Sequence, residues 1–478
     1  MEARAYINGV FVIGKKRYSI ISPNTLEECG TATALSKKGI DQAFEVAKNS
    51  QKEWASLPRE ERIDYIETFK QLLIENKEEL AKIMLLEIGK PFQQSIKEID
   101  RTVALINETI FAYHNILVKT IKGSTLGVPE KMISIIREPL GVVTAISPFN
   151  YPVNLSLAKI IPALISGNSV VFKPATNGSL SGYKMARLFD AAKFPAGVFN
   201  MVTGRGSEIG DYLTNHKGAN AISYTGSTRV GLSISENAKM QNVVLEMGGK
   251  DPALVLKDAN LDSTIDNIIK GAFSFAGQRC TAIKRVFVHE SKKKEFELGI
   301  KTKVASIPSG TSDSDVMVVP LITEASAKFQ RKLINDAVKK GAKILIGGNI
   351  NKNFVEPTVL VNVDETMLIA YEEQFGPVLP IIYYSDLNDA IRQINESEYG
   401  LQSSVYGNDI EDAVEAANQI EAGSVNINCA PSRGPDRLPF TGVKNSGFGV
   451  QGIKYALESM TRPKNLVIFK SKKKRFRK

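Results

Sequence analysis

Cys280 is the residue whose setting most suggests nucleophilic chemistry, because it follows a glycine and an arginine in Gly277-Gln-Arg279-Cys280-Thr281. A thiol attacks a carbonyl carbon at neutral pH when its pKa is lowered or a base lies beside it. Arg279 could supply positive potential that lowers the pKa of the thiol. A lone cysteine in an apolar region is more often a small core residue, so position alone leaves both interpretations open.

Glu246 and Asn150 each follow a β-rich run, where a side chain can face a cleft. Partial burial there raises the pKa of a glutamate toward the range of a general base, and a turn carboxylate paired with Lys250 is the alternative. Asn150 lies between Pro148 and Pro152, which would hold its amide rigidly as a donor to an oxyanion. An asparagine that only forms a turn is the more common outcome.

Two glycine-containing turns could approach a phosphate group. Thr225–Gly231 follows a strand-like run and opens a helical pattern, and the free N–H groups of a helix start favour an anion. This segment lacks the Gly-x-Gly-x-x-Gly spacing of the usual dinucleotide-binding turn, and Gly204–Gly210 misses that spacing by one residue. Each turn alone is a weak signal for a nucleotide.

The segments that could carry chemistry are joined by alternating strand-like and helical patterns. After a strand-like stretch at Arg4–Ile13, helical periodicity dominates, with apolar stripes around Ile66–Leu73 and from Ile96 to Ile110. Farther along, helical patterns separate short β-rich runs at 141–148, 169–173, 198–202, 221–224 and 243–245. A second β/α series extends to about residue 450. This alternation predicts an α/β protein with a doubly wound parallel sheet.

Length and composition bound the class of protein. With 478 residues, 43% of them hydrophobic, the chain can form two or three domains with sizeable cores. No apolar run reaches the length of a membrane-spanning helix and the N-terminus lacks the layout of a signal peptide, so we expect neither feature. Three scattered cysteines, Cys29, Cys280 and Cys429, favour a reducing, cytoplasmic location, and the three histidines lack the spacing of metal ligands.

The net charge of +10 is concentrated in residues 470–478, which contain seven Lys or Arg and no acid. A solvated tail is the simplest interpretation, and nonspecific binding to nucleic acid or another polyanion is the alternative. The rest of the chain shows neither a zinc-finger pattern nor a basic stripe with interleaved aromatic residues. We therefore expect no specific nucleic-acid partner.

Taken together, these segments resemble the aldehyde dehydrogenase superfamily in content, order and spacing, from about residue 5 to 465. The matching motifs are Pro148-Phe-Asn150, Phe172-Lys-Pro174, Thr225–Gly231, Glu246-Met-Gly-Gly-Lys250, Gly277-Gln-Arg-Cys280, Glu373-Gln-Phe-Gly-Pro377 and Lys444-Asn-Ser-Gly447. The resemblance implies a cofactor-binding domain of residues 1–117 and 137–246 and an α/β catalytic domain of residues 247–450. It also implies that a small β excursion, residues 118–136, joins residues 451–478 in the contacts of a homotetramer, although the sequence does not decide between dimer and tetramer.

The resemblance implies a role for each matching residue. Cys280 would be the nucleophile, Glu246 the general base, and Asn150 with the Cys280 backbone N–H the oxyanion-binding site. The cofactor site would comprise Lys173, Thr176, Gly226, Ser227, Met247, Glu373 and Phe375. Members that prefer NAD usually carry a glutamate where this chain has Thr176, and loss of that acid removes repulsion toward a 2′-phosphate. We therefore predict NADP as the cofactor.

Within the superfamily, the chain is similar to the branch of non-phosphorylating glyceraldehyde-3-phosphate dehydrogenases, which form 3-phosphoglycerate through a thioacyl enzyme without inorganic phosphate. The resemblance places the substrate at Arg101, Tyr151, Arg279, Thr281 and Arg433. Arginines suit a phosphorylated aldehyde because they present planar, permanently charged donors to a phosphate. Succinate-semialdehyde dehydrogenase is the alternative enzyme, since a carboxylate also binds arginine. A non-catalytic protein on the same fold is the alternative class.

Overall fold

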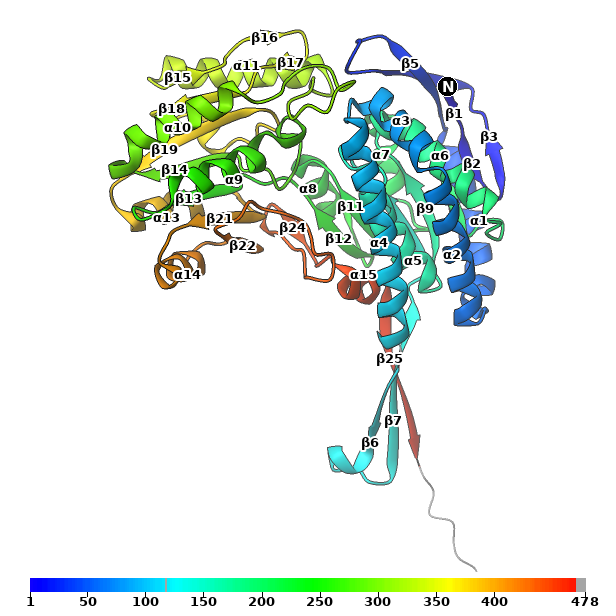
Figure 1. Cartoon of the computed structure of the whole chain (residues 1–478). Coiled ribbons are helices and arrows are strands. Elements are labelled where there is room, and N and C mark those ends of the chain that lie inside the picture. The colour runs from blue at the N-terminus through cyan, green and yellow to red at the C-terminus, as the bar shows by residue number, and fades with distance from the viewer. Residues whose placement is uncertain (117, 470–478) are drawn as a thin grey trace, which may run out of the picture.

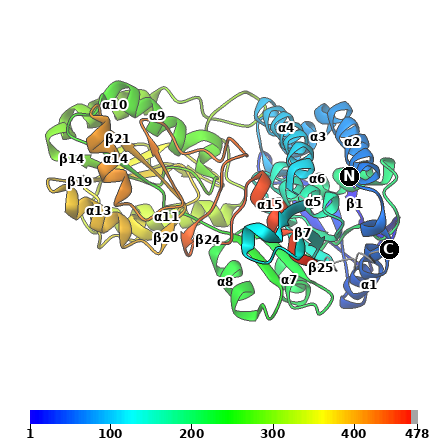
Figure 2. The same cartoon turned by 90° about the horizontal axis from the view of Figure 1, so that it is seen from below.

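The computed structural model describes residues 1–116 and 118–469 and shows two lobes with a narrow arm below them (Figure 1). Each lobe is built around one large, mostly parallel sheet, and the arm is an antiparallel three-stranded ribbon. Seen from below, the arm lies beneath the lobe that holds the N-terminus (Figure 2). The predicted α/β class, with a doubly wound sheet and a small β excursion, is confirmed. The basic residues 470–478 lie outside the described residues.

The first sheet has the strand order β24-β12-β11-β8-β9-β10-β2-β3, and its five central strands run parallel. These are β8 (Val142–Ile146), β9 (Ser169–Lys173), β10 (Phe199–Met201), β11 (Ala221–Thr225) and β12 (Asn242–Glu246). The order changes direction between β8 and β11, and ligands bind at the carboxyl ends of strands beside such a switch point. The outer strands are β2 (Ala5–Ile7), β3 (Val10–Val12) and β24 (Gly447–Phe448).

Helices cover both faces of this sheet because its strands are apolar on both sides. Val142 and Val171 pack into one core and Val143, Val170 and Phe172 into another, as the two-residue period of a strand requires. The first face carries α1 (Lys37–Ser56), α7 (Gly206–Thr214) and α8 (Thr228–Asn237). The second carries α2 (Arg59–Glu75), α3 (Lys77–Ile88), α4 (Phe92–Ile116), α5 (Asn154–Ile165) and α6 (Ser179–Ala191).

The second sheet begins six residues after β12 ends and has the order β15-β18-β19-β14-β13-β21-β22. Its strands are β13 (Pro252–Val255), β14 (Arg285–His289), β15 (Lys343–Ile346), β18 (Thr358–Val361), β19 (Val378–Tyr384), β21 (Gln402–Tyr406) and β22 (Ser424–Ile427). The helices of this lobe are α9 (Leu261–Phe273), α10 (Lys293–Ala305), α11 (Glu324–Lys339), α12 (Leu368–Tyr371), α13 (Leu387–Asn395) and α14 (Ile410–Asn418).

The arm consists of β6 (Val118–Lys122), β7 (Lys131–Pro139) and β25 (Thr461–Phe469), and the short helix α15 (Ile453–Ser459) leads into it. Strands β7 and β25 pair along their whole length. The small sheet beside the N-terminus contains β1 (Glu2–Ala3), β4 (Lys16–Ile21) and β5 (Glu28–Ala34). Among the described residues, no helix combines the length and the apolar character needed to cross a membrane.

Candidate active site

The carboxyl edge of the first sheet brings predicted catalytic and cofactor residues together. Lys173 and Glu246 are the last residues of β9 and β12, and Asn150 follows β8. The turn at Gly226 and Ser227 connects β11 to α8. Parallel strands end at a common edge, so residues far apart in the chain gather there.

A tight loop after α9 presents Cys280 to this edge. Phe275 and Ala276 have φ of 54° and 53°, and Gly277 has φ of 69°, so three successive residues adopt the left-handed conformation. A Cβ at Gly277 would lie 2.6 Å from the carbonyl oxygen of Gly376, and only glycine fits there. The Cys280 N–H makes no hydrogen bond within residues 1–116 and 118–469, which leaves it available to an oxyanion.

Asn150 joins the first sheet to the loop that carries Cys280. Its buried side chain donates through Nδ2 to the carbonyl oxygen of Gln278 over 2.8 Å. A primary amide has two N–H donors, so a second remains for an oxyanion beside Cys280. The contact also fixes the separation between the predicted donor and the predicted nucleophile.

Glu246 is held by an arginine and a threonine. Its Oε1 accepts a hydrogen bond from Arg433 Nη1 over 2.6 Å, and its Oε2 accepts one from Thr225 Oγ1 over 2.9 Å. Burial favours the neutral acid, but the charges of Arg433 and Lys159 and these hydrogen bonds outweigh it and lower the pKa of Glu246. The prediction that burial raises this pKa is therefore wrong in this arrangement, because two cations lie beside the carboxylate.

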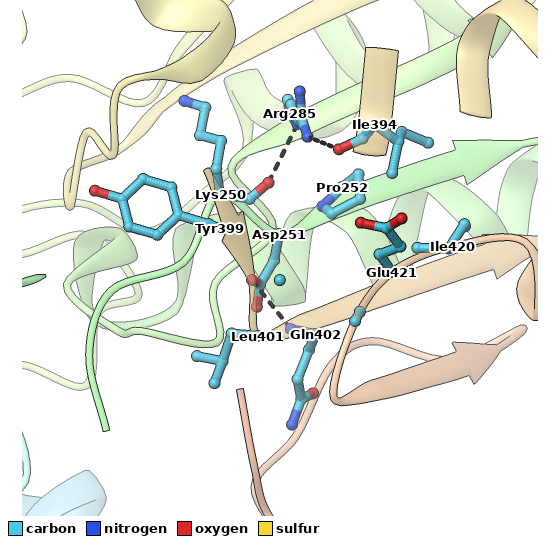
Figure 3. Close-up of a pocket in the computed structure, with 12 residues that line it drawn as sticks. Lys250, Asp251, Pro252, Arg285, Ile394, Tyr399, Leu401, Gln402, Ile420 and Glu421 are labelled. Atoms are coloured by element: carbon cyan, nitrogen blue, oxygen red, sulfur yellow. Dashed lines mark hydrogen bonds between the residues drawn. The ribbon is translucent and has the colours of Figure 1, made fainter. Parts of the chain in front are cut away.

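Lys250 is not the partner of Glu246. Its Nζ donates to Gln374 Oε1 over 2.6 Å. Figure 3 shows the second contact, in which Arg285 Nε donates to the Lys250 carbonyl oxygen over 3.2 Å. The alternative of a Glu246–Lys250 pair is therefore wrong. Lys250 instead anchors the segment around Gln374, which also carries the predicted cofactor residue Glu373.

The Cys280 thiol is neutral in this arrangement. Burial and the charge of Glu246 raise its pKa to about 12, against the opposing charges of Lys284 and Arg433. Arg279 does not direct its guanidinium to the thiol, because it donates to the Gly271 carbonyl oxygen over 2.6 Å. Formation of the thiolate therefore needs a further positive charge beside Cys280 or a displacement of Glu246.

The predicted substrate residues gather only in part. Arg433 is nearly buried beside Glu246, and Arg101 pairs with Asp436 on the same loop, with N–O distances of 3.0 and 2.8 Å. Tyr151 follows Asn150, and Thr281 follows Cys280 and is buried. Arg279 is not brought to this group, because its donors face the carboxyl end of α9.

Most of the predicted cofactor residues lie along the same edge, whereas Glu373 and Phe375 lie in the second lobe, between α12 and β19. The first turn of α8, after Ser227, receives no hydrogen bond from a capping side chain. Lys173 Nζ donates to the carbonyl oxygen of Pro174, and burial lowers its pKa to about 8. Glu373 accepts a hydrogen bond from the Gly249 N–H. Met247 lies against Gly231, and the Phe375 ring packs edge-on to that of Phe149. Thr176 is partly exposed at the start of the short helix η2 (Thr176–Gly178).

Known proteins share both this sequence and this structure. A model of the aldehyde dehydrogenase family matches residues 11–466. The chain belongs to the aldehyde dehydrogenase family. It is 42% identical over 468 residues to the NADP-dependent glyceraldehyde-3-phosphate dehydrogenase of Streptococcus equinus, with 98% of each chain covered. It is 41% identical over 457 residues to the enzyme of the same name from Pisum sativum, covering 95% of this chain and 92% of that one.

Solved structures of enzymes with similar names also superimpose on this chain. The crystal structure of NADP-dependent glyceraldehyde-3-phosphate dehydrogenase from Bacillus halodurans, complexed with NADP, superimposes with a TM-score of 0.97 at 46% identity and covers 98% of this chain and 100% of that one. The NADP complex of glyceraldehyde-3-phosphate dehydrogenase from Methanocaldococcus jannaschii gives a TM-score of 0.91 at 34% identity, with 95% and 100% covered.

One group in this aldehyde dehydrogenase was missed by sequence reasoning, a buried ion pair between Lys90 and Glu98, whose side chains are each 1% exposed. Lys90 Nζ donates to the carbonyl oxygen of Asn150 over 3.1 Å and lies 3.5 Å from the ring centroid of Tyr151. Glu98 Oε1 accepts hydrogen bonds from the backbone N–H groups of Val153 and Asn154, and so caps the start of α5. The sequence carries no signal of this pairing, because burial of a lysine depends on contacts distant in the chain.

Replacing Lys90 with methionine is expected to lower the free energy of unfolding by about 3 kcal/mol, because Glu98 would remain buried without its partner. We also expect the pre-steady-state burst of cofactor reduction to slow by about tenfold, since the backbone of Asn150 loses its anchor. Chemical denaturation and stopped-flow absorbance measure the two effects. The control is Lys184→Met, which breaks a pair with the half-exposed Glu79. An unchanged burst rate in folded Lys90→Met would contradict the positioning role.

Proposed function

We propose that this aldehyde dehydrogenase oxidises D-glyceraldehyde 3-phosphate to 3-phosphoglycerate, with reduction of NADP and without inorganic phosphate. The observation that carries the proposal is the position of Arg433, which pairs with Glu246 and whose charge lowers the pKa of Cys280, while Arg101 of α4 pairs with Asp436 on the loop of Arg433. Arginines beside the reacting group suit a substrate whose phosphate lies near its carbonyl. The 42% and 41% identical relatives named for this substrate support it over succinate semialdehyde.

The reaction proceeds in two stages. The Cys280 thiolate attacks the aldehyde carbon, and the Cys280 N–H and the Asn150 amide stabilise the oxyanion. Loss of hydride leaves a thioacyl enzyme. Glu246 then takes a proton from water, whose oxygen attacks the thioacyl carbon, and the C–S bond breaks. The product leaves as a carboxylate, which does not react with a thiol, and the oxidation is therefore irreversible.

The carboxyl edge of the first sheet fits NADP. Gly226 and Ser227 would hold the pyrophosphate, because the N–H groups at the start of α8 lack a side-chain cap. Lys173 is a buried amine whose hydrogen bond among the described residues goes to a neutral carbonyl, and with Thr176 it suits a 2′-phosphate. When bound, the oxidised nicotinamide accepts the hydride, and its positive charge favours the thiolate. The remaining contacts would come from Met247, Glu373 and Phe375.

Thr176→Glu is expected to shift the ratio of kcat/KM for NADP to that for NAD by about a hundredfold toward NAD, because a carboxylate repels the 2′-phosphate. Thr176 is partly exposed, so the larger side chain fits without disturbing the core. Initial rates with each cofactor and one aldehyde measure the ratio. Asn177→Gln is the matched control and should leave it unchanged. A wild-type enzyme that used NAD as efficiently as NADP would contradict the assignment.

The proposed function is tested by the reduction of NADP with D-glyceraldehyde 3-phosphate in phosphate-free buffer. We expect rapid reduction with 3-phosphoglycerate as the product, and a kcat/KM for succinate semialdehyde lower by about a hundredfold or more. A requirement for inorganic phosphate, or greater efficiency with succinate semialdehyde, would overturn the proposal.

We further propose that residues 1–117 and 137–246 bind the cofactor, that residues 247–450 carry catalysis, and that the arm joins subunits of a cytoplasmic homotetramer. Support for the arm comes from Leu466, Val467, Ile468 and Phe469, which are exposed large apolar side chains on one strand. A strand with such a surface is normally covered by another chain. Light scattering of the full chain and of Val467→Asp tests the assembly, and an unchanged mass would contradict the role of β25.

A further inference from the structure

Arg433 contacts the predicted general base and also belongs to the predicted substrate site. Its Nη1 donates to Glu246 over 2.6 Å, and its Nη2 donates to Gln451 Oε1. Its side chain is 12% exposed and that of Glu246 is 4% exposed, so water does not replace either partner freely. In the proposed function, the same guanidinium binds the phosphate of the aldehyde.

Glu246 is a poor base while Arg433 holds it. One carboxylate oxygen accepts from Arg433 and the other from Thr225, whose hydroxyl also contacts the buried amine of Lys159 over 2.6 Å. A carboxylate that accepts hydrogen bonds from charged and neutral donors is stabilised as the anion, and it takes a proton from water less readily. The basicity of Glu246 therefore depends on Arg433, the same side chain that is proposed to bind the substrate phosphate.

We propose that the substrate phosphate draws Arg433 away from Glu246 and thereby releases the general base for hydrolysis of the thioacyl enzyme. This inference rests on the proposed function, because it requires a phosphate within reach of Arg433. A phosphate dianion competes well with the carboxylate, since it offers more charge and more acceptor oxygens to a guanidinium. Neighbouring Arg101 stays on Asp436 and keeps the loop in place.

The released base acts in one step that needs only water. Glu246 accepts one proton as the water oxygen bonds to the thioacyl carbon, and the electron pair of the C=O bond moves to oxygen. That pair returns, the C–S bond breaks, and its electrons leave with the sulfur of Cys280 as a thiolate. The product acid then loses its proton to solvent, and Glu246 releases to solvent the proton that it took from water, which restores the carboxylate. No further oxidant or reductant takes part.

The coupling predicts that an aldehyde without a phosphate is turned over slowly, because hydrolysis of its thioacyl enzyme is slow. We expect D-glyceraldehyde to be oxidised to a thioacyl enzyme on Cys280 with a burst of NADPH. Because Arg433 still holds Glu246, hydrolysis of that thioacyl enzyme then limits steady-state turnover. A dianion supplied separately should then restore the base. We expect sodium phosphite to raise steady-state turnover of D-glyceraldehyde by about tenfold or more, because Glu246 accepts a proton more readily once Arg433 no longer donates to it.

The experiment measures NADPH formation from D-glyceraldehyde with increasing phosphite, against sodium chloride at the same ionic strength. The steady-state rate should rise to saturation while the amplitude and rate of the burst stay unchanged. Arg433→Met should lose the response to phosphite. Arg437→Met, on the same loop, is the matched control, because it breaks only an exposed pair with Glu108, keeps the Arg433–Glu246 pair and should respond to phosphite as the wild type does. Thermal unfolding checks that each variant is folded.

Wild-type turnover that does not respond to phosphite would overturn the inference, and so would an equal response in folded Arg433→Met. An acceleration of the burst alone would also overturn it, because it would place the effect before hydrolysis. The wild-type result is decisive even where a variant fails to fold. Failure of the proposed function looks different, since D-glyceraldehyde 3-phosphate itself would then not be oxidised in phosphate-free buffer.

Discussion

Replacement of Cys280 with alanine is expected to lower kcat with D-glyceraldehyde 3-phosphate by about four orders of magnitude or more, since no covalent intermediate can form. The half-buried thiol occupies the end of a loop whose backbone is set by Phe275, Ala276 and Gly277, so its removal leaves the fold intact. Steady-state NADPH formation measures the loss, and cofactor binding followed by fluorescence should be unchanged.

The matched control for this variant is Cys29→Ser. Cys29 is also a half-buried free thiol, but it lies on β5 and donates to the carbonyl oxygen of Ile20, a contact that serine can keep. Burial raises the pKa of Cys29 to about 11, and no predicted active-site residue lies on its sheet. Full activity of Cys29→Ser, with none in Cys280→Ala, would assign the chemistry to one thiol. Retention of more than a few per cent of turnover in Cys280→Ala would contradict the mechanism.

Glu246→Gln is expected to separate the two stages of the reaction. A full burst of NADPH, equivalent to the number of active sites, should remain, because attack by Cys280 and hydride loss do not need the carboxylate. Turnover after the burst should fall by about a hundred- to ten-thousandfold, the usual contribution of a general base. Rapid mixing with absorbance detection gives both values from one record, so the burst serves as the internal control.

The same variant is informative about Arg433. Glutamine keeps the size of the side chain and can still accept a hydrogen bond, but it leaves the buried guanidinium without a counter-ion. The free energy of unfolding should therefore fall by about 2 to 3 kcal/mol without bound phosphate. Phosphite should restore part of that stability. Loss of the burst in a folded Glu246→Gln enzyme would show that Glu246 acts earlier, before the thioacyl enzyme forms.

Local patterns in the sequence were enough to predict the strands and helices that carry the site. The β-rich runs at 169–173 and 221–224 are β9 and β11, and the apolar stripe from Ile96 to Ile110 is on α4. Such patterns are readable because the periods of strands and helices are properties of short segments. Motif order also indicated the family, which the match over residues 11–466 confirmed.

The ion pairs of the site, and the pKa shifts that they cause, depend on contacts between residues distant in the chain. The pKa of Glu246 is lowered by Arg433, which lies 187 positions later in the chain, and Lys90 is buried under Tyr151 rather than solvated. Arg279, next to the nucleophile in sequence, directs its charge elsewhere. Electrostatic effects depend on distance and burial in three dimensions, and neither quantity follows from the identity of neighbouring residues. Candidate residues for the site could therefore be named from the sequence, whereas their pairing, and with it the contact of Glu246 with Arg433, could not.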